Sequence, residues 1–396
     1  MVLCVTEIVS YGSLYYAFPV LAGNITAGTG WSRTAITAAF SAGNVVGALV
    51  GVVAGRLIDK RGPRLVMTAG SVIGTAALAG IAAAPTMGWF IVAWLIAGVA
   101  MAGVFYPPAF AALTGWYGPD RVRALTTLTV AAGFASTIFA PLTAALAGHL
   151  TWRGVYLVLA IIMGLITIPA HALALRLPWT SPSRPRHQPA VDGRQMRHIL
   201  ASRAFLLLVA SMTLSAFALY AVAVNLVPLL TGRGLSPTLA AWALGLGGAG
   251  QVAGRLCYRP LLARVGVRSR AAIITGAGGV CIFILAVLPG QPVLLTGASI
   301  LVGSARGLFT LLEATVVSDH WGPEGYASLN GVFSAPLTAA MAIAPSIGAA
   351  LATFAGGYPA LFLILAATGA ASAVLALASG PAPRPAGDRP PAVPAD

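Results

Sequence analysis

Charge is scarce in this sequence. Only 8% of its 396 residues are Asp, Glu, Lys or Arg, and just nine are acidic, whereas soluble domains carry roughly 25% charged residues. Hydrophobic residues make up 58% of the chain. This composition excludes a soluble globular protein and indicates a protein that crosses a membrane several times.

Cysteines and enzyme motifs are also scarce. Cys4, Cys257 and Cys281 all lie in apolar runs, and their spacing gives neither a disulfide framework nor a metal site. No G-x-x-x-x-G-K-[ST] loop occurs, which argues against ATP-driven transport. We therefore expect no enzymatic activity, no cofactor and no metal.

Long apolar runs are abundant. A run of about 20 residues crosses a hydrocarbon core of about 30 Å as a helix, which satisfies its own backbone hydrogen bonds. We predict an all-α membrane protein of twelve transmembrane helices. The predicted segments are 2–27, 34–57, 64–83, 88–114, 122–148, 153–175, 203–230, 237–262, 270–289, 292–318, 326–354 and 358–379.

The net charge of +14 is placed asymmetrically. Of the 23 Lys and Arg residues, only Arg33, Arg153 and Arg233 fall in the loops after segments one, five and seven. Most of the others lie in the alternate loops, and basic residues accumulate in cytoplasmic loops. We therefore expect an integral protein of a bacterial inner membrane with both termini in the cytoplasm, and no nucleic-acid partner.

The second half of the chain repeats the first about 204 residues later. The pattern W-Y-G-P-D at 116–120 returns as H-W-G-P-E at 320–324, and Pro141 returns as Pro345. A stretch rich in Pro, Arg and His separates the halves, which suits rocking of one half against the other. The predicted parts are an N-terminal six-helix bundle at 1–177, a cytoplasmic linker at 178–202 with a short helix near 193–200, a C-terminal six-helix bundle at 203–380 and a disordered tail at 381–396.

The loop between segments two and three has a specific pattern. Residues 55–64 read G-R-L-I-D-K-R-G-P-R, with Gly62 for a tight turn and cations at the membrane face. This resembles the signature loop of the major facilitator superfamily, and the resemblance implies the major facilitator fold, two pseudo-symmetric bundles that alternate access. The alternative is a plain basic cytoplasmic loop. The expected gating residues are Gly55, Asp59, Lys60, Arg61, Gly62 and Arg64.

Shorter stretches narrow the resemblance. Y-A-F-P at 16–19 and G-W-S-R at 30–33 are similar to the opening of the monocarboxylate porter family, which implies transport of a monocarboxylate. Arg255, one turn after Gln251, falls where that family carries a substrate-binding Arg. This chain departs from the family at Val20, where animal members have Lys, and at Gln251, where they have an acidic residue. The family's mechanism of proton coupling therefore cannot be transferred unchanged to this chain.

Polar side chains inside apolar segments are candidate functional groups, because a charge near the bilayer centre costs about 2.5–3.5 kcal/mol on insertion scales. In superfamily members, helices 1, 4, 7 and 10 line the central cavity. In the first segment, Glu7, Tyr11, Tyr15 and Phe18 have a spacing that places them on one helix face. The expected substrate-binding residues are Arg306, Arg255, Tyr11, Tyr15, Tyr106, Tyr220, Asn225 and Gln251.

Several alternatives stay open for the charged residues. Arg306 and Glu313 share a helix face about 10.5 Å apart, and Arg306 either binds a substrate carboxylate or pairs with Glu313 or Glu7. Arg255 either contacts substrate or snorkels toward the cytoplasm. Glu313 is the first candidate for reversible protonation, since burial favours a neutral carboxyl and a nearby Arg favours an ionised one. Glu7 is the second, with a solvated helix end as its alternative.

The sequence thus predicts a secondary transporter of a small organic anion, a monocarboxylate, coupled to protons. The expected partners are that anion, protons and membrane lipid, and we expect a monomer. The first alternative is a proton-driven exporter of drugs or toxic compounds. The second is a sensor without transport or a membrane-integral enzyme, which the absence of any long soluble stretch disfavours.

Overall fold

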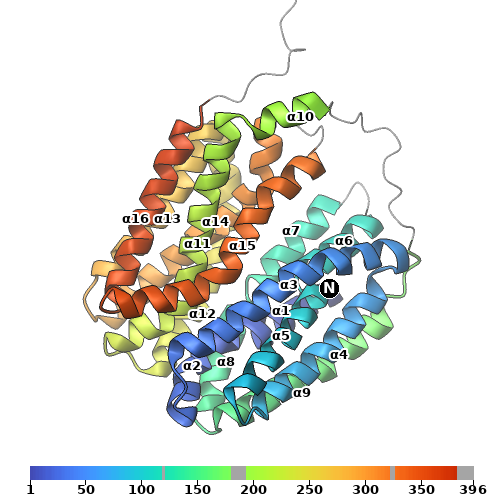
Figure 1. The fold of residues 1–396 in the computed structure, drawn as a ribbon, viewed down its shortest axis with the longest axis vertical. Coiled ribbons are helices and arrows are strands. Elements are labelled where there is room, and N and C mark those ends of the chain that lie inside the picture. Colours follow the sequence, from blue (N-terminus) through green and yellow to red (C-terminus); the bar gives the residue numbers. More distant parts are fainter. Residues whose placement is uncertain (118–120, 180–192, 322–325, 381–396) are drawn as a thin grey trace, which may run out of the picture.

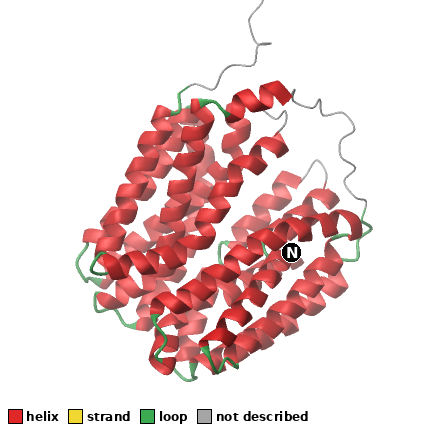
Figure 2. Ribbon diagram, in the orientation of Figure 1, coloured by secondary structure: helices red, strands yellow, loops and turns green. Residues whose placement is uncertain are grey.

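The computed structural model describes residues 1–117, 121–179, 193–321 and 326–380. All regular structure in these ranges is helical (Figure 2), so the predicted all-α fold is confirmed. Helices form because apolar runs in a bilayer leave the backbone no polar partner other than itself. The predicted tail at 381–396 and residues 180–192 of the predicted linker lie outside the described residues.

The N-terminal bundle contains the elements that precede the linker. They are α1 (Val2–Tyr11), η1 (Gly12–Tyr16), α2 (Ala17–Thr29), α3 (Arg33–Arg61), α4 (Pro63–Ala82), α5 (Met87–Val104), α6 (Tyr106–Tyr117), α7 (Arg121–Ala132), α8 (Ala135–Ala147), α9 (Trp152–Pro169) and η3 (Ala170–Ala174). The elements η1 and η3 are π-helices.

The short helix α10 (Gly193–Leu200) lies where the sequence predicted it, before the C-terminal bundle. That bundle contains α11 (Arg203–Gly232), α12 (Pro237–Arg264), α13 (Val267–Val287), α14 (Pro292–Trp321), α15 (Tyr326–Phe354) and α16 (Tyr358–Ala378). We call the end of the molecule that carries α10 the linker side.

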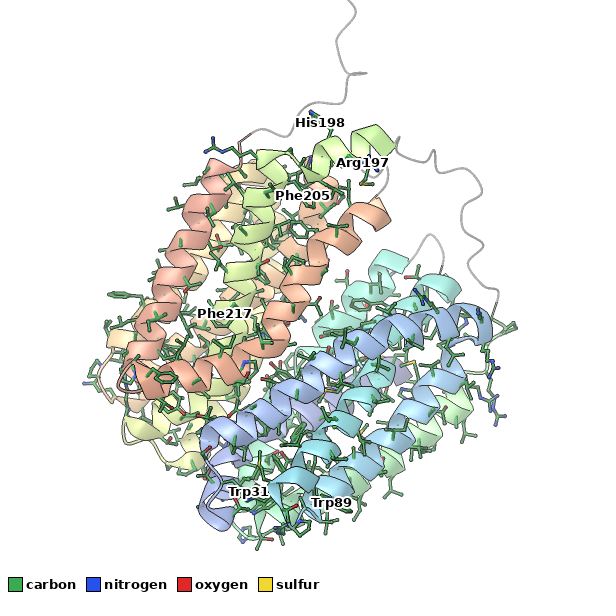
Figure 3. The ribbon with its side chains drawn as sticks, in the orientation of Figure 1. Trp31, Trp89, Arg197, His198, Phe205 and Phe217 are labelled. Carbon is green, nitrogen blue, oxygen red and sulfur yellow. The ribbon has the colours of Figure 1, made fainter. Side chains whose placement is uncertain are left out.

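Within the described residues, ten helices are long and apolar enough to cross a membrane. The other two predicted spans, the run from α1 to α2 and α12, are helical but are not among these ten. Figure 3 places Trp31 and Trp89 at the end of the molecule opposite Arg197 and His198. Aromatic and basic side chains at opposite ends suit a protein with two membrane interfaces.

The two bundles repeat the same helix pairs (Figure 1). In the N-terminal bundle, α3 packs on α5 and α4 packs on α9; in the C-terminal bundle, α12 packs on α14 and α13 packs on α16. These pairs occupy equivalent places in the sequence repeat. The duplication seen in the sequence is therefore also a duplication of packing.

The bundles contact each other mainly through two equivalent helix pairs, α8 with α12 and α3 with α15, and less extensively through α2 and α11. The hydroxyl of Thr137 donates to the carbonyl of Gly245 at 2.8 Å, and the backbone N–H of Ser346 donates to the hydroxyl of Ser41 at 3.1 Å. Both bonds lie in the half of the molecule away from the linker. Figure 1 shows the bundles meeting there and diverging toward α10.

Irregular helix geometry is concentrated in the N-terminal bundle. The first span contains η1, the fourth is interrupted at Phe105, whose backbone is extended, and the fifth is interrupted at residues 133–134. The Pro107–Pro108 pair explains the interruption at Phe105, since proline is tolerated in the first turn of a new helix but not in a helix interior. By contrast, α11, α12, α14 and α15 are each continuous over 28 to 30 residues.

The apolar core of the N-terminal bundle is correspondingly divided. A large cluster includes Phe18, Phe40 and Trp94, while a smaller cluster on the linker side includes Leu3 and Leu128. The core of the C-terminal bundle forms one large cluster. Cores divided in this way allow two parts of a bundle to shift relative to each other.

The predicted signature loop forms a sharp turn between α3 and α4. Gly62 has a φ of +80°, a conformation that glycine adopts without strain, and Pro63 begins α4. Arg64 donates through Nε to the carbonyl of Ala172 in η3 at 2.8 Å. Lys60 and Arg61 are exposed and Gly55 is half-buried, while the side chain of Asp59 lies outside the described part of the chain. The gating role of this loop remains a prediction.

Candidate functional site

The tight packing of α12 on α14 sets the geometry of the site. A Cβ atom at Gly303 would overlap the backbone of Gly247, and one at Gly307 would overlap the carbonyl of Gln251. Glycine at these positions therefore allows the two helix backbones to touch. The contact brings Gln251 of α12 beside Arg306 of α14.

The Gly307→Ala variant tests this packing. The added methyl group must push α12 away from α14, and overpacking of this kind destabilises by about 1–3 kcal/mol. Gly297→Ala is the matched control on the same helix, because nothing lies within 4 Å of its added Cβ. We expect a lower thermal unfolding midpoint for purified Gly307→Ala protein and an unchanged or slightly higher one for Gly297→Ala. Equal midpoints for the two variants would contradict the packing described.

A pocket with about 340 Å³ of empty space, part of it open to solvent, lies between the bundles. Most of its wall comes from α11, α12 and α14, and Tyr16 and Ser136 are contributed by the N-terminal bundle. No acidic side chain is among the described residues that line it. The lining residues are Tyr16, Ser136, Leu219, Val222, Ala223, Leu226, Leu244, Gly247, Gln251, Ser299, Val302, Gly303 and Arg306.

Arg306 is the cation of this pocket. Its guanidinium lies 4.4 Å from the ring centroid of Tyr220, and Tyr15 and Tyr16 lie within electrostatic range of it. Among the described residues, the ion pair found joins Arg270 to Asp319 at 2.7 Å. The alternative of an ion pair between Arg306 and Glu313 or Glu7 is therefore not found in the described part of the chain. The Arg306 guanidinium is left available for an anion.

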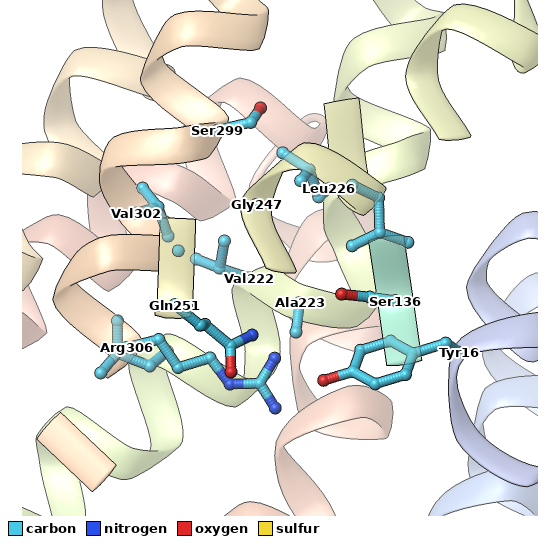
Figure 4. Close-up of a pocket in the computed structure, with 13 residues that line it drawn as sticks. Tyr16, Ser136, Val222, Ala223, Leu226, Gly247, Gln251, Ser299, Val302 and Arg306 are labelled. Carbon is cyan, nitrogen blue, oxygen red and sulfur yellow. The ribbon is translucent and has the colours of Figure 1, made fainter. Parts of the chain in front are cut away.

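The pocket has a polar end and an apolar end. Figure 4 shows the guanidinium of Arg306 and the amide of Gln251 pointing toward the hydroxyl of Tyr16. The remaining wall is mainly aliphatic, with Leu226 and Val302 on it. The polar end can bind an anionic group at Arg306, and the aliphatic end suits an apolar part of the same ligand.

The first span departs from its predicted register. Tyr11 stacks on Phe105 with ring centroids 3.9 Å apart, but Phe18 stacks on Phe40 at 4.4 Å and Tyr15 also packs against Phe40. The prediction that these residues share one face therefore does not hold past Tyr11. The π-helix η1 is the cause, because its wider turns rotate every later side chain relative to an α-helix.

This change of register brings Tyr16 to the pocket, a residue that the sequence reasoning missed. Both tyrosines belong to the apolar core, but the predicted binding residue Tyr15 does not line the pocket, and its hydroxyl has no hydrogen-bond partner in the structure. Two adjacent tyrosines at 15 and 16 were the available signal. Choosing between them requires the position of the π-helix.

A pair of variants separates the two tyrosines. We expect Tyr16→Phe to weaken binding of a carboxylate about tenfold or more, because a hydrogen bond to a charged group contributes about 1.5–3 kcal/mol. Tyr15→Phe removes a hydroxyl that has no partner, so we expect a much smaller loss. Titration calorimetry of the two purified variants measures the difference. A larger loss in Tyr15→Phe would show that Tyr15, as the sequence predicted, contacts the substrate.

Arg255 lies at the boundary between the bundles rather than in the wall of the pocket. Its Nη1 donates to the backbone carbonyl of Thr129 in α7, and it lies within electrostatic range of Tyr106. The side chain is only 7% exposed, so it does not snorkel in this structure. Its substrate contact remains a prediction.

The other predicted residues lie around the pocket. Asn225 donates to the carbonyl of Ala221 in its own helix at 2.8 Å and does not line the pocket. Glu313 is half-buried, two helical turns from Arg306 toward the linker side, and Tyr220 lies within electrostatic range of both residues.

Tyr11, Tyr106 and Glu7 form a separate group in the N-terminal bundle. The rings of Tyr11 and Tyr106 lie 4.8 Å apart, and both lie within electrostatic range of Glu7. Glu7 is fully buried, so the alternative of a solvated helix end is wrong. Within the described residues, no group of three or more His, Cys, Asp or Glu side chains is arranged to hold a metal ion.

The chain matches a family model in sequence and solved transporters in structure. A family model described as Major Facilitator Superfamily matches residues 3–291 and 208–395. The nucleoside transporter NupG has 16% identity and a TM-score of 0.71, with 96% of this chain and 97% of NupG covered. A bacterial homolog of the human lysosomal transporter Spinster, inward-facing and occupied, has 16% identity and a TM-score of 0.70, with 96% and 92% covered. Among curated proteins, none matches this chain in sequence.

Proposed function

The chain belongs to the Major Facilitator Superfamily, a family of secondary transporters, and we propose that it carries a small organic monocarboxylate together with protons. The likeness to NupG and to the Spinster homolog, at 16% identity, extends to the fold alone. The substrate class therefore has to be inferred from the pocket.

The observation that supports a carboxylate is the guanidinium of Arg306, which packs on Tyr220 but has no ion-pair partner among the described residues, in a pocket without acidic lining residues. A buried charge is costly unless it is paired, so a site of this kind gains most from an anionic ligand. The planar fork of Arg matches a carboxylate through two parallel hydrogen bonds. Gln251 and Tyr16 add neutral donors at the same end of the pocket.

The aliphatic part of the pocket supports a single anionic group on an otherwise apolar molecule. Leu226, Leu244 and Val302 offer no partner to a second carboxylate. Transfer of an unpaired charge against such side chains is unfavourable. A monocarboxylate fits both ends of the pocket, whereas a dicarboxylate leaves one charge unpaired.

Transport follows from breaking the contacts between the bundles. We propose that the linker side faces the cytoplasm of a bacterial inner membrane, as the placement of basic residues favours. The bundles meet away from that side, so this structure corresponds to an inward-facing state. Opening outward requires loss of the Thr137–Gly245 and Ser41–Ser346 hydrogen bonds.

Glu313 is the proposed proton site nearest to the substrate. It lies on the same helix as Arg306 and on the linker side of it. Loading a proton together with the carboxylate brings in a neutral pair, which lowers the cost of moving charge through the closed transporter. Tyr220, within electrostatic range of both residues, connects the two sites.

Counterflow in proteoliposomes tests the proposal. A panel of labelled monocarboxylates, dicarboxylates, nucleosides and cationic drugs is offered with and without an imposed pH gradient. We expect exchange of at least one monocarboxylate and its accumulation when the outside is acidic. Drug transport without carboxylate transport would contradict the proposal and support the exporter that the sequence left as an alternative.

A further inference from the structure

A second cavity, with about 1170 Å³ of empty space that is partly open to solvent, lies in the N-terminal bundle on the linker side. We call it the vestibule. It shares no lining residue with the pocket that contains Arg306. Its walls come from α1, α6, α7 and the end of the span that contains η3, and they include Leu3, Cys4, Leu113, Trp116, Tyr117, Arg123, Ala124, Thr127, Leu128 and Leu175.

Glu7 lies one helical turn beyond the vestibule. Leu3 and Cys4 line the cavity, and they precede Glu7 by four and three residues on α1, so the three side chains are neighbours on the helix surface. Side chains on a helix lean toward its N-terminus, which directs the Glu7 carboxyl toward the cavity. Leu3 and Leu128, 6% and 1% exposed, lie in the apolar cluster at this level.

The surroundings of Glu7 give it no fixed partner. Both of its carboxyl oxygens are buried and have no hydrogen-bond partner in the structure. Tyr11 and Tyr106 face it on the side of the bundle interface, and Arg255 of α12 lies beyond Tyr106. The charged side chain in the vestibule itself is Arg123, which is exposed. A buried carboxyl without a partner in a transporter is expected to exchange protons.

We propose that the vestibule is a proton access route to Glu7, separate from the path of the substrate. Water in the vestibule delivers a hydronium ion, whose proton moves to the Glu7 carboxylate and leaves a neutral carboxyl and a water molecule. The apolar cluster that includes Leu3 and Leu128 opens when the linker-side core of the N-terminal bundle shifts at the interruptions in its helices. This inference rests on the proposed proton coupling and assigns it a second site.

The native cysteines allow a direct test on the full chain. In a Cys257→Ser, Cys281→Ser background, Cys4 is alkylated with a bulky polar maleimide. With no substrate present, the pH is then changed rapidly, and the rate at which Glu7 is protonated is measured from the infrared band of the protonated carboxyl. The matched control retains Cys257, which is exposed on α12, and carries Cys4→Ser and Cys281→Ser.

We expect a carboxyl band that responds to pH and is absent in Glu7→Gln. Alkylation of Cys4 is expected to slow that response about tenfold or more, while alkylation of Cys257 leaves it unchanged. Ala124→Trp, which fills the vestibule from α7 and leaves Cys4 unmodified, is expected to act in the same direction. The proposal is overturned if the folded protein does not react at Cys4, if full reaction leaves the rate unchanged, or if Glu7→Gln retains the band.

The outcome is independent of the identity of the substrate, since no substrate is present. Failure of this test together with acid-driven uptake of a monocarboxylate would leave symport intact and assign the proton to another group such as Glu313. The expected result here, combined with a lack of carboxylate transport, would support the proton route through the vestibule and contradict the proposed substrate.

Discussion

Arg306→Ala is expected to lower the affinity for a monocarboxylate by about a hundredfold or more. Removing one partner of a buried charged hydrogen-bonded pair costs about 2–5 kcal/mol, and each 1.4 kcal/mol is a factor of ten in affinity. No other cation lines the pocket among the described residues, so no neighbouring side chain replaces the lost charge. Titration calorimetry on purified protein measures the effect, and counterflow in proteoliposomes is expected to be abolished.

Two further variants define what the loss means. Arg306→Lys keeps the charge but not the planar fork, so we expect an affinity between those of the native protein and Arg306→Ala. Arg197→Ala removes an exposed cation of α10, at the linker-side end of the molecule in Figure 3, and is expected to bind as the native protein does. Native affinity in Arg306→Ala would show that Arg306 has a structural role only.

Glu313→Gln is expected to abolish accumulation driven by a pH gradient while counterflow of the same substrate persists. The amide keeps the size of the side chain but does not exchange a proton, so only the coupled part of the cycle is lost. The measurement compares acid-driven uptake with exchange at equal pH in the same proteoliposomes.

Asp319→Asn is the matched control for Glu313→Gln. It lies on the same helix, but its carboxylate is paired with Arg270 at 2.7 Å. We expect lower stability and retained coupling in this variant. Acid-driven accumulation by Glu313→Gln at the native level would exclude Glu313 as a required proton site.

Much of the fold could be predicted from the sequence, because the bilayer leaves few choices. Apolar runs of sufficient length must be helical, and a Gly-Pro step such as Gly62–Pro63 ends one helix and begins the next. The repeat of W-Y-G-P-D at residue 320 predicted two similar bundles. Both bundles indeed use the same helix pairs.

The candidate site could be predicted only in part, because its geometry depends on small departures from regular helices. Within the π-helix η1, Tyr16 lines the pocket and the predicted residue Tyr15 does not. Periodicity calculated with 3.6 residues per turn cannot include such a step. The hydrogen bond from Arg255 to the backbone of Thr129 could not be predicted from the sequence either, since it depends on how the two bundles approach each other.

The two bundles differ in the continuity of their helices and cores. Long continuous helices in the C-terminal bundle hold Arg306, Gln251 and Glu313 in a fixed frame. The N-terminal bundle has interrupted helices and a divided core, and it contains the buried Glu7. We infer that the C-terminal bundle binds the anion and that the N-terminal bundle supplies a movable proton site.

The most direct measurement of the central claim compares one monocarboxylate with its uncharged amide on the native protein. The two ligands have nearly the same shape, so their difference in affinity reports the charge that Arg306 recognises. We predict that the affinity for the carboxylate is higher than that for the amide by about a hundredfold or more, and that Arg306→Ala removes most of this preference. Equal affinities of the native protein for the two ligands would contradict a carboxylate site at Arg306.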